Sequence, residues 1–174
     1  MTRYIFGYGS LIWRPDFPFR SKHVAIAHDY ARRLWQGSVD HRGTPGAPGR
    51  VVTLAAERDA QCIGMLFEIA AADADEITSA LDRREQGGYV RRELEVTRLP
   101  ELERVLALTY IALPDNPNYL GPAEARQIAA QVDTSHGPSG SNREYLERLV
   151  LALGELGAAD AHILEVHSLL GEGT

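Results

Sequence analysis

The sequence predicts an α+β protein that folds as a single domain. Its 174 residues suffice for one hydrophobic core and leave little room for a second. Most strand-like patterns precede residue 114, and most helical patterns follow it. Strands followed by helices are typical of α+β proteins, whereas α/β proteins alternate the two. The chain shows no internal repeat and no linker, so residues 1–174 are assigned to one domain.

The first predicted strand, Thr2–Phe6, is rich in β-branched and aromatic residues and ends at a glycine turn. Gly7 and Gly9 lack a Cβ, so we expect positive φ or a close backbone approach there, with Tyr8 held between them. Successive N–H groups of such a turn attract a carboxylate or a developing oxyanion. The alternative is a strand end followed by ordinary core residues, Leu11–Trp13.

Two short strands are expected next, at Val24–Ala27 and Arg33–Gln36. The segment Gly37–Arg50 then has four glycines and two prolines among its 14 residues, which predicts a loop. Loops of this length are uncommon within a domain and often bind ligands, and the alternative is a disordered hairpin tip. Arg50–Ala55 and Cys62–Ile69 predict a hairpin around the charged turn between them.

A short helix is predicted after the hairpin. Asp73–Glu76 has the spacing of a capping box, and Ile77 and Leu81 lie four residues apart on one face. Gly87–Gly88 ends this helix and leads into a strand. Residues 93–97 alternate between polar and apolar, which predicts that this strand has one solvent-facing side.

The remainder of the chain predicts one more buried strand and then helices. The apolar run 105–113 is the strand. A helix is expected to start at Gly121–Pro122, because proline suits the first helical turn. Ser141–Glu144 is a second capping box at the start of a long apolar-faced helix. A final helix follows Gly157.

Composition excludes several classes of protein. A net charge of −6 argues against a general nucleic-acid-binding role, which requires a basic surface. Cys62 is the only cysteine, so no intrachain disulfide forms, and its apolar surroundings predict a buried, inert thiol. No apolar run approaches the ~20 residues of a membrane helix. We therefore expect a soluble, cytoplasmic protein without nucleic-acid or membrane partners; its oligomeric state stays open and is compatible with a monomer.

No cofactor is expected from the motifs. The six histidines are scattered without metal-ligand spacing, so no metal is predicted. Neither a GxxxxGK nor a GxGxxG pattern is present, which argues against a nucleotide cofactor. Ser10 lacks the glycine two residues later that a nucleophile elbow needs, so it is expected to donate hydrogen bonds instead of acting as a nucleophile.

Glu85 is the remaining candidate for chemistry. This carboxylate stands at the junction between the predicted helix and its two terminating glycines, where side chains often project into a cleft. The alternative is a surface carboxylate paired with Arg84 or Arg91.

Several ordered blocks of the chain share one pattern with a known family. They are Phe6–Trp13, Trp35–Ser38, Asp40–Gly43, Pro48–Leu54, Arg84-Glu85, Asp115–Pro117, Tyr119–Pro122, Gly137–Gly140, Asn142 and Glu144–Leu146. Together they resemble the ChaC-type, glutathione-specific γ-glutamylcyclotransferases over nearly the whole chain. The resemblance implies a small, mostly antiparallel β-barrel with flanking helices. It also implies cleavage of glutathione to 5-oxoproline and cysteinylglycine.

The resemblance also implies roles for individual residues. Glu85 maps to the catalytic acid-base, although Gln86 replaces the family's lysine and Arg83 stands where an apolar residue is expected. The residues that map to the γ-glutamyl-binding turn are Tyr8, Gly9, Ser10 and Leu11, and Ile5, Phe6 and Gly7 stand beside them as further candidate substrate contacts. Gln36, Arg50 and Tyr145 lie in matching blocks and are candidate substrate contacts, with core or loop-bracing roles as the alternative.

Two other functions stay open at this point. One is a cyclotransferase for other γ-glutamyl compounds. The other is a non-catalytic anion-binding module or a regulator of cation transport. Glu85 separates this last class from the enzymes, because a pure binder of an anionic peptide has little use for a carboxylate facing it.

Overall fold

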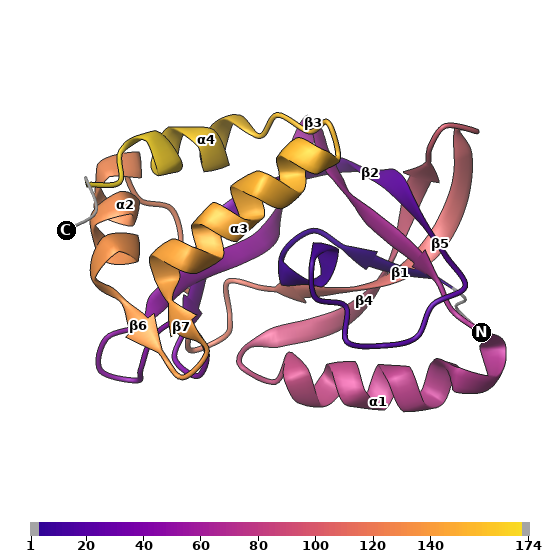
Figure 1. Ribbon diagram of the computed structural model, residues 1–174, viewed down its shortest axis with the longest axis horizontal. Coiled ribbons are helices and arrows are strands. Elements are labelled where there is room, and N and C mark those ends of the chain that lie inside the picture. Colours follow the sequence, from indigo (N-terminus) through magenta and orange to yellow (C-terminus); the bar gives the residue numbers. More distant parts are fainter. Residues whose placement is uncertain (1–3, 172–174) are drawn as a thin grey trace.

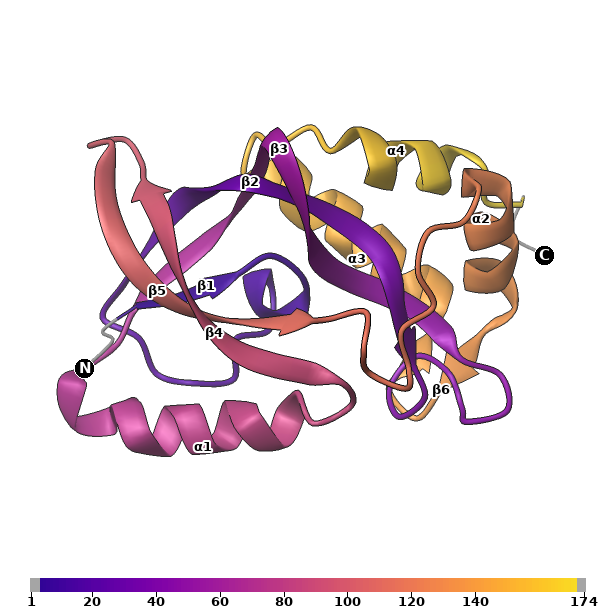
Figure 2. The ribbon, with the colours of Figure 1, turned by 180° about the vertical axis from the view of Figure 1, so that it is seen from behind.

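The computed structural model describes residues 4–171. Its strands form a closed barrel in the order β1-β3-β2-β4-β5. Helices α2, α3 and α4 pack on one another and on the long β2-β3 ribbon, and α1 lies apart from them along the barrel (Figures 1 and 2). The predicted α+β class and the barrel with flanking helices are both confirmed.

The first strand, β1, runs over Tyr4–Gly7. It pairs antiparallel with β3 and makes one parallel pairing with β5, at Ile5 opposite Leu108, which closes the barrel. The predicted strand is confirmed for the described residues, while Thr2 and Arg3 lie outside them.

The next two strands are much longer than predicted. β2 spans 18 residues, Ser21–Ser38, and β3 spans 20 residues, Gly49–Glu68, and the two pair antiparallel along their length. The prediction of separate short strands and a local hairpin was wrong. Asp29 and Asp59 take left-handed conformations, with φ of 61° and 62°, and the Asp59 N–H donates to Asp29 Oδ1 at 2.8 Å. Asp29 and Asp59 therefore interrupt the regular strand pairing opposite each other, and both strands continue beyond them.

The loop predicted at Gly37–Arg50 is shortened by strand pairing to residues 39–48, and it is fastened to a small hairpin. That hairpin comprises β6, His136–Gly137, and β7, Gly140–Ser141. The Ser139 N–H donates to the His41 carbonyl at 2.9 Å. The two sides of the loop approach each other closely at Gly43. A Cβ there would lie 2.1 Å from the Gly49 nitrogen, so only glycine fits this position. The loop is therefore anchored and is not a free hairpin tip.

Helix α1, Ala74–Arg84, buries Ile77 and Leu81 as predicted. Asp73 stands at its N-cap without a side-chain capping bond, so the predicted capping box does not form. Two 3₁₀ segments complete this half of the chain: η1, Ser10–Ile12, follows β1, and η2, Ala71–Asp73, precedes α1.

Strands β4, Tyr89–Arg98, and β5, Glu103–Ala112, follow α1 and pair antiparallel. As predicted, β4 exposes one face and β5 is the more buried of the two. Strand β4 meets β2 only over residues 96–98, opposite 25–27.

The C-terminal helices are α2, Ala125–Thr134, α3, Asn142–Glu155, and α4, Ala161–Ser168. Helix α2 starts later than Gly121–Pro122, where it was predicted. The Gly121 N–H donates to the Trp35 carbonyl and Gly121 has a φ of 71°, which holds this segment against β2. Half of the capping box predicted for α3 is present: Ser141 Oγ accepts from the Glu144 N–H, whereas the Glu144 carboxylate pairs with Arg42 and Arg148. None of the helices within residues 4–171 has the length and apolar character needed to cross a membrane.

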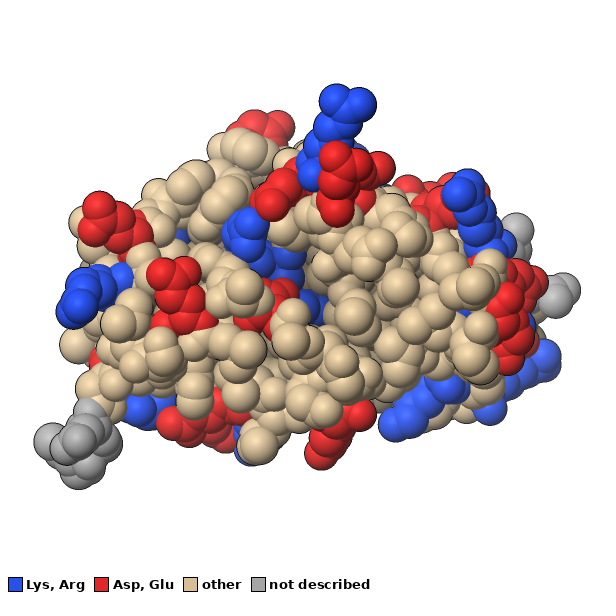
Figure 3. Space-filling model, turned by 90° about the horizontal axis from the view of Figure 1, so that it is seen from above, with Lys and Arg blue, Asp and Glu red and all other residues tan. Residues whose placement is uncertain are grey.

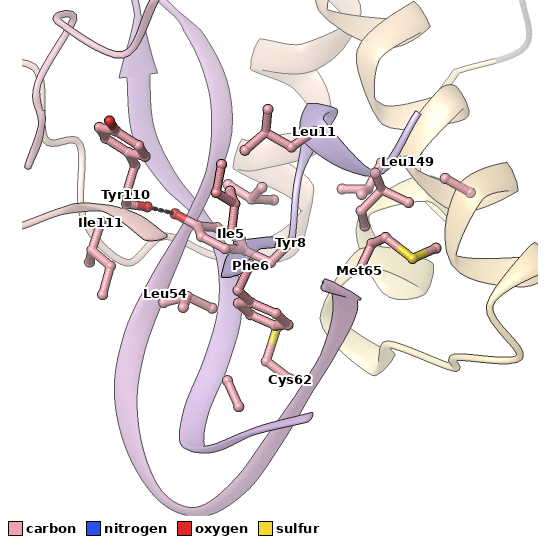
Figure 4. Close-up of a cluster of buried hydrophobic side chains, with 14 of the residues drawn as sticks. Ile5, Phe6, Tyr8, Leu11, Leu54, Cys62, Met65, Tyr110, Ile111 and Leu149 are labelled. Atoms are coloured by element: carbon pink, nitrogen blue, oxygen red, sulfur yellow. Dashed lines mark hydrogen bonds between the residues drawn. The ribbon is translucent and has the colours of Figure 1, made fainter. Parts of the chain in front are cut away.

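The hydrophobic core is continuous between the barrel and the helices. Ile5 and Phe6 of the barrel and Leu149 of α3 are all buried members of one cluster (Figure 4). Cys62 lies in this cluster at 1% exposure, and burial raises the pKa of its thiol to about 11. The predicted burial of the thiol is confirmed, and the raised pKa is in line with the expected low reactivity. On the face drawn in Figure 3, acidic and basic side chains are interspersed.

Candidate active site

A pocket opens between the N-terminal turn, the 39–48 loop and the end of α1. Its walls come from Phe6–Leu11, from Asp40–Arg42, from Val51 and Val52 of β3, from Arg84, Glu85 and Tyr89, from Tyr110 of β5, and from Ser139 and Tyr145. These residues are far apart in sequence and come together because the barrel closes and the loop folds back over its end.

The glycine turn forms one wall of the pocket. Gly9 has a φ of −127°, so positive φ is not the reason for the glycines. A Cβ on Gly7 would lie 2.7 Å from the Leu11 Cβ, and one on Gly9 would lie 2.9 Å from a Val52 methyl group. Of the two reasons expected for these glycines, close approach is therefore the one that applies, and neither residue has a positive φ.

The turn also presents backbone donors. Helix η1 makes its first hydrogen bond from the Ile12 N–H to the Gly9 carbonyl, at 3.0 Å. The N–H groups of Ser10 and Leu11 precede that bond, as the first N–H groups of any helix do. Because both residues line the pocket, these donors suit an anion or a developing negative charge.

Tyr8, between the two glycines, is held at both ends. Its hydroxyl donates to the Tyr110 carbonyl at 2.6 Å, which is the dashed line in Figure 4. Its own carbonyl accepts from Arg32 Nε at 2.7 Å. Arg32 in turn is paired with Asp160 at the start of α4, at 2.8 Å. The turn is therefore fixed by contacts from β5 and, through Arg32, from α4.

Glu85 stands directly after the last residue of α1. Its N–H still donates to the Leu81 carbonyl at 2.9 Å, and the Gly87–Gly88 turn, with a φ of 128° at Gly88, then redirects the chain into β4. The side chain lines the pocket and is 18% exposed. The prediction that this junction places Glu85 in a cleft is confirmed.

The charge of Glu85 is set mainly by burial. Burial raises the pKa of the Glu85 carboxyl, the Arg84 guanidinium opposes this, and Asp40 adds to it. Arg84 Nε lies 3.4 Å from Glu85 Oε1, whereas Arg91 pairs with Asp82. The alternative of a pairing with Arg84 is thus partly realised, but inside the pocket and not on the open surface.

Arg84 connects the carboxylate to the glycine turn. It donates to Ser10 Oγ at 2.9 Å and to the Arg14 carbonyl at 2.8 Å. Ser10 Oγ therefore accepts a charged hydrogen bond, an environment that fits a positioning hydroxyl. Among residues 4–171, no group of three or more His, Cys, Asp or Glu side chains is placed to hold a metal ion.

The sequence of this chain matches proteins of a known family. The model of the ChaC-like protein family matches residues 3–172. The chain belongs to the ChaC-like family. Relatives include the glutathione-specific γ-glutamylcyclotransferase 1 of Danio rerio, 46% identical over 84% of this chain and 76% of that protein. The Homo sapiens protein of the same name is 39% identical over 97% of this chain and 78% of its own length.

A solved structure shares the fold of this ChaC-like chain. The yeast γ-glutamyl cyclotransferase specific to glutathione superposes with a TM-score of 0.90 at 31% identity. The alignment covers 96% of this chain and 94% of the yeast one. The two chains therefore share the same overall fold.

The predicted site residues of this ChaC-like chain divide into two groups. Those that line the pocket are Phe6, Gly7, Tyr8, Gly9, Ser10, Leu11, Glu85 and Tyr145. Ile5, Gln36 and Arg50 do not line it. Ile5 is a core residue at 1% exposure. Gln36 donates to the Gly87 carbonyl, and Arg50 donates to the carbonyls of Leu34 and Gly121. The contacts of Gln36 and Arg50 agree with the bracing alternative, and the assignment of all three residues as substrate contacts stays a prediction.

Other pocket residues were not singled out from the sequence. Asp40 and Arg42 reach the pocket because the loop is clasped to the β6-β7 hairpin, and Tyr89 reaches it from the start of β4. Asp40 lies within 2.9 Å of where a Cβ on Gly87 would stand, close to the Glu85 junction. The matching block Asp40–Gly43 was the available signal, but a block match alone does not show which side chains face a cavity.

Burial of Glu85 predicts a pH-dependent effect on stability. Below about pH 4.3, the usual glutamate pKa, the carboxyl is protonated in both the folded and unfolded states. As the pH rises through the raised folded-state pKa, the buried group ionises and stability is lost. Glu85→Gln removes this loss, so the variant should gain stability relative to the wild type at pH 8 compared with pH 4. Denaturant unfolding at both pH values measures this, and an equal difference at the two would contradict it.

Proposed function

We propose that this ChaC-like protein is a glutathione-specific γ-glutamylcyclotransferase that cleaves glutathione to 5-oxoproline and cysteinylglycine. The observation that carries the proposal is a largely buried carboxylate with a raised pKa, Glu85, in the same pocket as the backbone donors of a glycine turn. The names of the relatives and the match to the yeast enzyme support the same reaction.

The reaction needs a nucleophile, which the substrate itself provides. The α-amine of the γ-glutamyl group attacks the γ-carbonyl of the same molecule and closes a five-membered ring, which expels cysteinylglycine. Because both groups belong to one molecule, holding it bent supplies much of the rate, with effective molarities of ~10⁵ M or more for well-placed groups. Water takes no part in the step.

Glu85 is proposed as the acid-base. It takes a proton from the substrate ammonium, which frees the attacking lone pair, and returns a proton to the departing amide nitrogen. A base is most efficient when its pKa lies near the working pH, so the upward shift caused by burial suits this role. Arg84 and Arg42 bring guanidinium donors to the pocket walls, where they pair with Glu85 and Glu144, and these donors can also bind the carboxylates of a substrate.

The proposal predicts that purified protein converts glutathione to 5-oxoproline without added metal or nucleotide. Because the nucleophile is the substrate's own amine, glutathione acetylated at that nitrogen should not react, and a chelator should leave the rate unchanged. Mass spectrometry of the products distinguishes the mechanisms. Release of free glutamate would identify water as the nucleophile and the protein as a hydrolase.

The same assay separates the alternative functions. Faster turnover of other γ-glutamyl amides would indicate a broader cyclotransferase, and binding of glutathione without turnover would indicate an anion-binding or regulatory module. We further propose that residues 1–174 act as one cytoplasmic domain, because barrel and helices share one core and the single cysteine is a free thiol.

A further inference from the structure

Four tyrosines line the pocket that contains Glu85: Tyr8, Tyr89, Tyr110 and Tyr145. Tyr110 donates its hydroxyl proton to Asp82 Oδ1 at 2.6 Å, and the other three hydroxyls differ in their partners. Tyr8 and Tyr145 are buried and Tyr89 is partly buried. Burial raises the pKa of all three phenols, to about 12 for Tyr145, so each carries its proton at neutral pH. Each hydroxyl therefore has one hydrogen bond to donate.

Two of these protons are committed to the backbone. Tyr8 donates to the Tyr110 carbonyl, and Tyr89 donates to the Val52 carbonyl, both at 2.6 Å. Tyr145 does the reverse, because its oxygen accepts from the Val52 N–H at 3.2 Å. No acceptor for the Tyr145 proton is found among residues 4–171. Its hydroxyl is thus the one of these three whose proton is available to a bound molecule.

The hydroxyl of Tyr145 is fixed at the glycine turn. Its oxygen lies 3.4 Å from where a Cβ on Gly9 would stand, in the same pocket as Ser10 and Leu11. The ring packs edge-on against Trp13, with centroids 5.8 Å apart, and the side chain is 5% exposed. The position of the donor is therefore set by packing before any substrate binds.

We propose that Tyr145 donates a hydrogen bond to the oxyanion that forms from the γ-carbonyl oxygen of the substrate. This inference rests on the proposed cyclotransferase function and adds a donor to it. As the C–N bond of the ring forms, the carbonyl electron pair moves to oxygen, and Glu85 holds the proton from the amine. When the intermediate collapses, the pair returns, the bond to the cysteinyl nitrogen breaks, and Glu85 protonates that nitrogen. The ring nitrogen then gives its second proton to Glu85, which passes it to the released amine, so the ring nitrogen is left with the single hydrogen of 5-oxoproline. Tyr145 keeps its own proton throughout.

The first test is Tyr145→Phe, which keeps the ring and its packing but removes the donor. Loss of one oxyanion donor typically lowers kcat by about 10² to 10³. We expect a loss in that range with KM changed less than threefold. A loss below tenfold, with 5-oxoproline still the product, would overturn the role of Tyr145 and leave the proposed function intact. A wild-type protein that makes no 5-oxoproline would overturn both.

A matched variant controls for the lost contact to Val52. Tyr89→Phe also removes one pocket hydroxyl and one hydrogen bond to Val52, but a hydroxyl whose proton is already committed. We expect its kcat to exceed that of Tyr145→Phe at least tenfold. Equal losses in the two variants would mean that anchoring Val52 is what matters, which would contradict the proposal.

A second measurement does not depend on the folding of either variant. Fluorotyrosine at position 145 keeps the hydroxyl but lowers its pKa. A donor fails once it ionises, so the alkaline fall in kcat should begin at lower pH than in the wild type. A hydroxyl that only accepts from the Val52 N–H would accept better as a phenolate, and an unshifted alkaline limb would overturn the proposal.

Discussion

Glu85→Gln is expected to lower kcat for glutathione by about 10² or more, the usual contribution of a positioned acid-base. Glutamine has nearly the same size and cannot accept the ammonium proton. It leaves the donors of the glycine turn and the Arg84 contact to Ser10 in place. We therefore expect the substrate to bind with a Kd within a few-fold of the wild-type value, measured by calorimetry, while 5-oxoproline release almost ceases.

Asp82→Asn is the matched control for this prediction. Asp82 lies three residues before Glu85 on the same helix, is exposed, and pairs with Arg91. Its oxygen accepts from the Tyr110 hydroxyl, and the carboxamide oxygen of asparagine retains that ability. The control should keep most of its activity. Normal turnover by Glu85→Gln would remove Glu85 from the mechanism and with it the proposed acid-base chemistry.

The position of Glu85 was predictable because its signals are local. The predicted helix has an apolar stripe and is ended by Gly87 and Gly88, so Glu85 was expected where the helix stops. The structure has this junction. The strand lengths were not predictable in the same way. Polar residues around Asp29 and Asp59 have the composition of turns, and only their pairing across the ribbon shows that the strands continue.

Long-range contacts also decided where α2 begins and what the loop does. Gly121–Pro122 has the local signal of a helix start, but hydrogen bonds from the Leu120 and Gly121 N–H groups to the Trp35 carbonyl hold that segment against β2. Asp40 lines the pocket in a loop whose backbone folds back on itself at Gly43, close to the Gly49 nitrogen. Long-range contacts also distinguish Tyr145 from the other tyrosines. Its hydroxyl accepts from the Val52 N–H, whereas the hydroxyls of Tyr8 and Tyr89 donate to backbone carbonyls. None of these partners lies close in sequence.

The second large effect is expected from Asp160→Asn, which removes the charge partner of a buried arginine. The Arg32 side chain is 1% exposed and donates to the carbonyls of Tyr8 and Ile63 as well as to Asp160. Breaking a buried ion pair by removing one charge typically costs about 3–5 kcal/mol, because the remaining charge is left uncompensated. For a chain of this length that lowers Tm by roughly 6–20 °C. Asparagine still caps α4 by accepting from the Ile163 N–H, so loss of the cap does not confound the result.

Glu95→Gln gives the matched comparison for Asp160→Asn. Glu95 pairs with Arg104 at 3.1 Å, but these side chains are 60% and 76% exposed. Exposed pairs contribute about 0–1 kcal/mol, so this variant should unfold within a few degrees of the wild type. Because Arg32 holds the Tyr8 carbonyl, Asp160→Asn should also lower activity at temperatures where the protein is still folded, which Glu95→Gln should not. Equal Tm shifts for the two variants would show that solvent already compensates the charge of Arg32. The contact from α4 through Arg32 would then not be what stabilises the glycine turn.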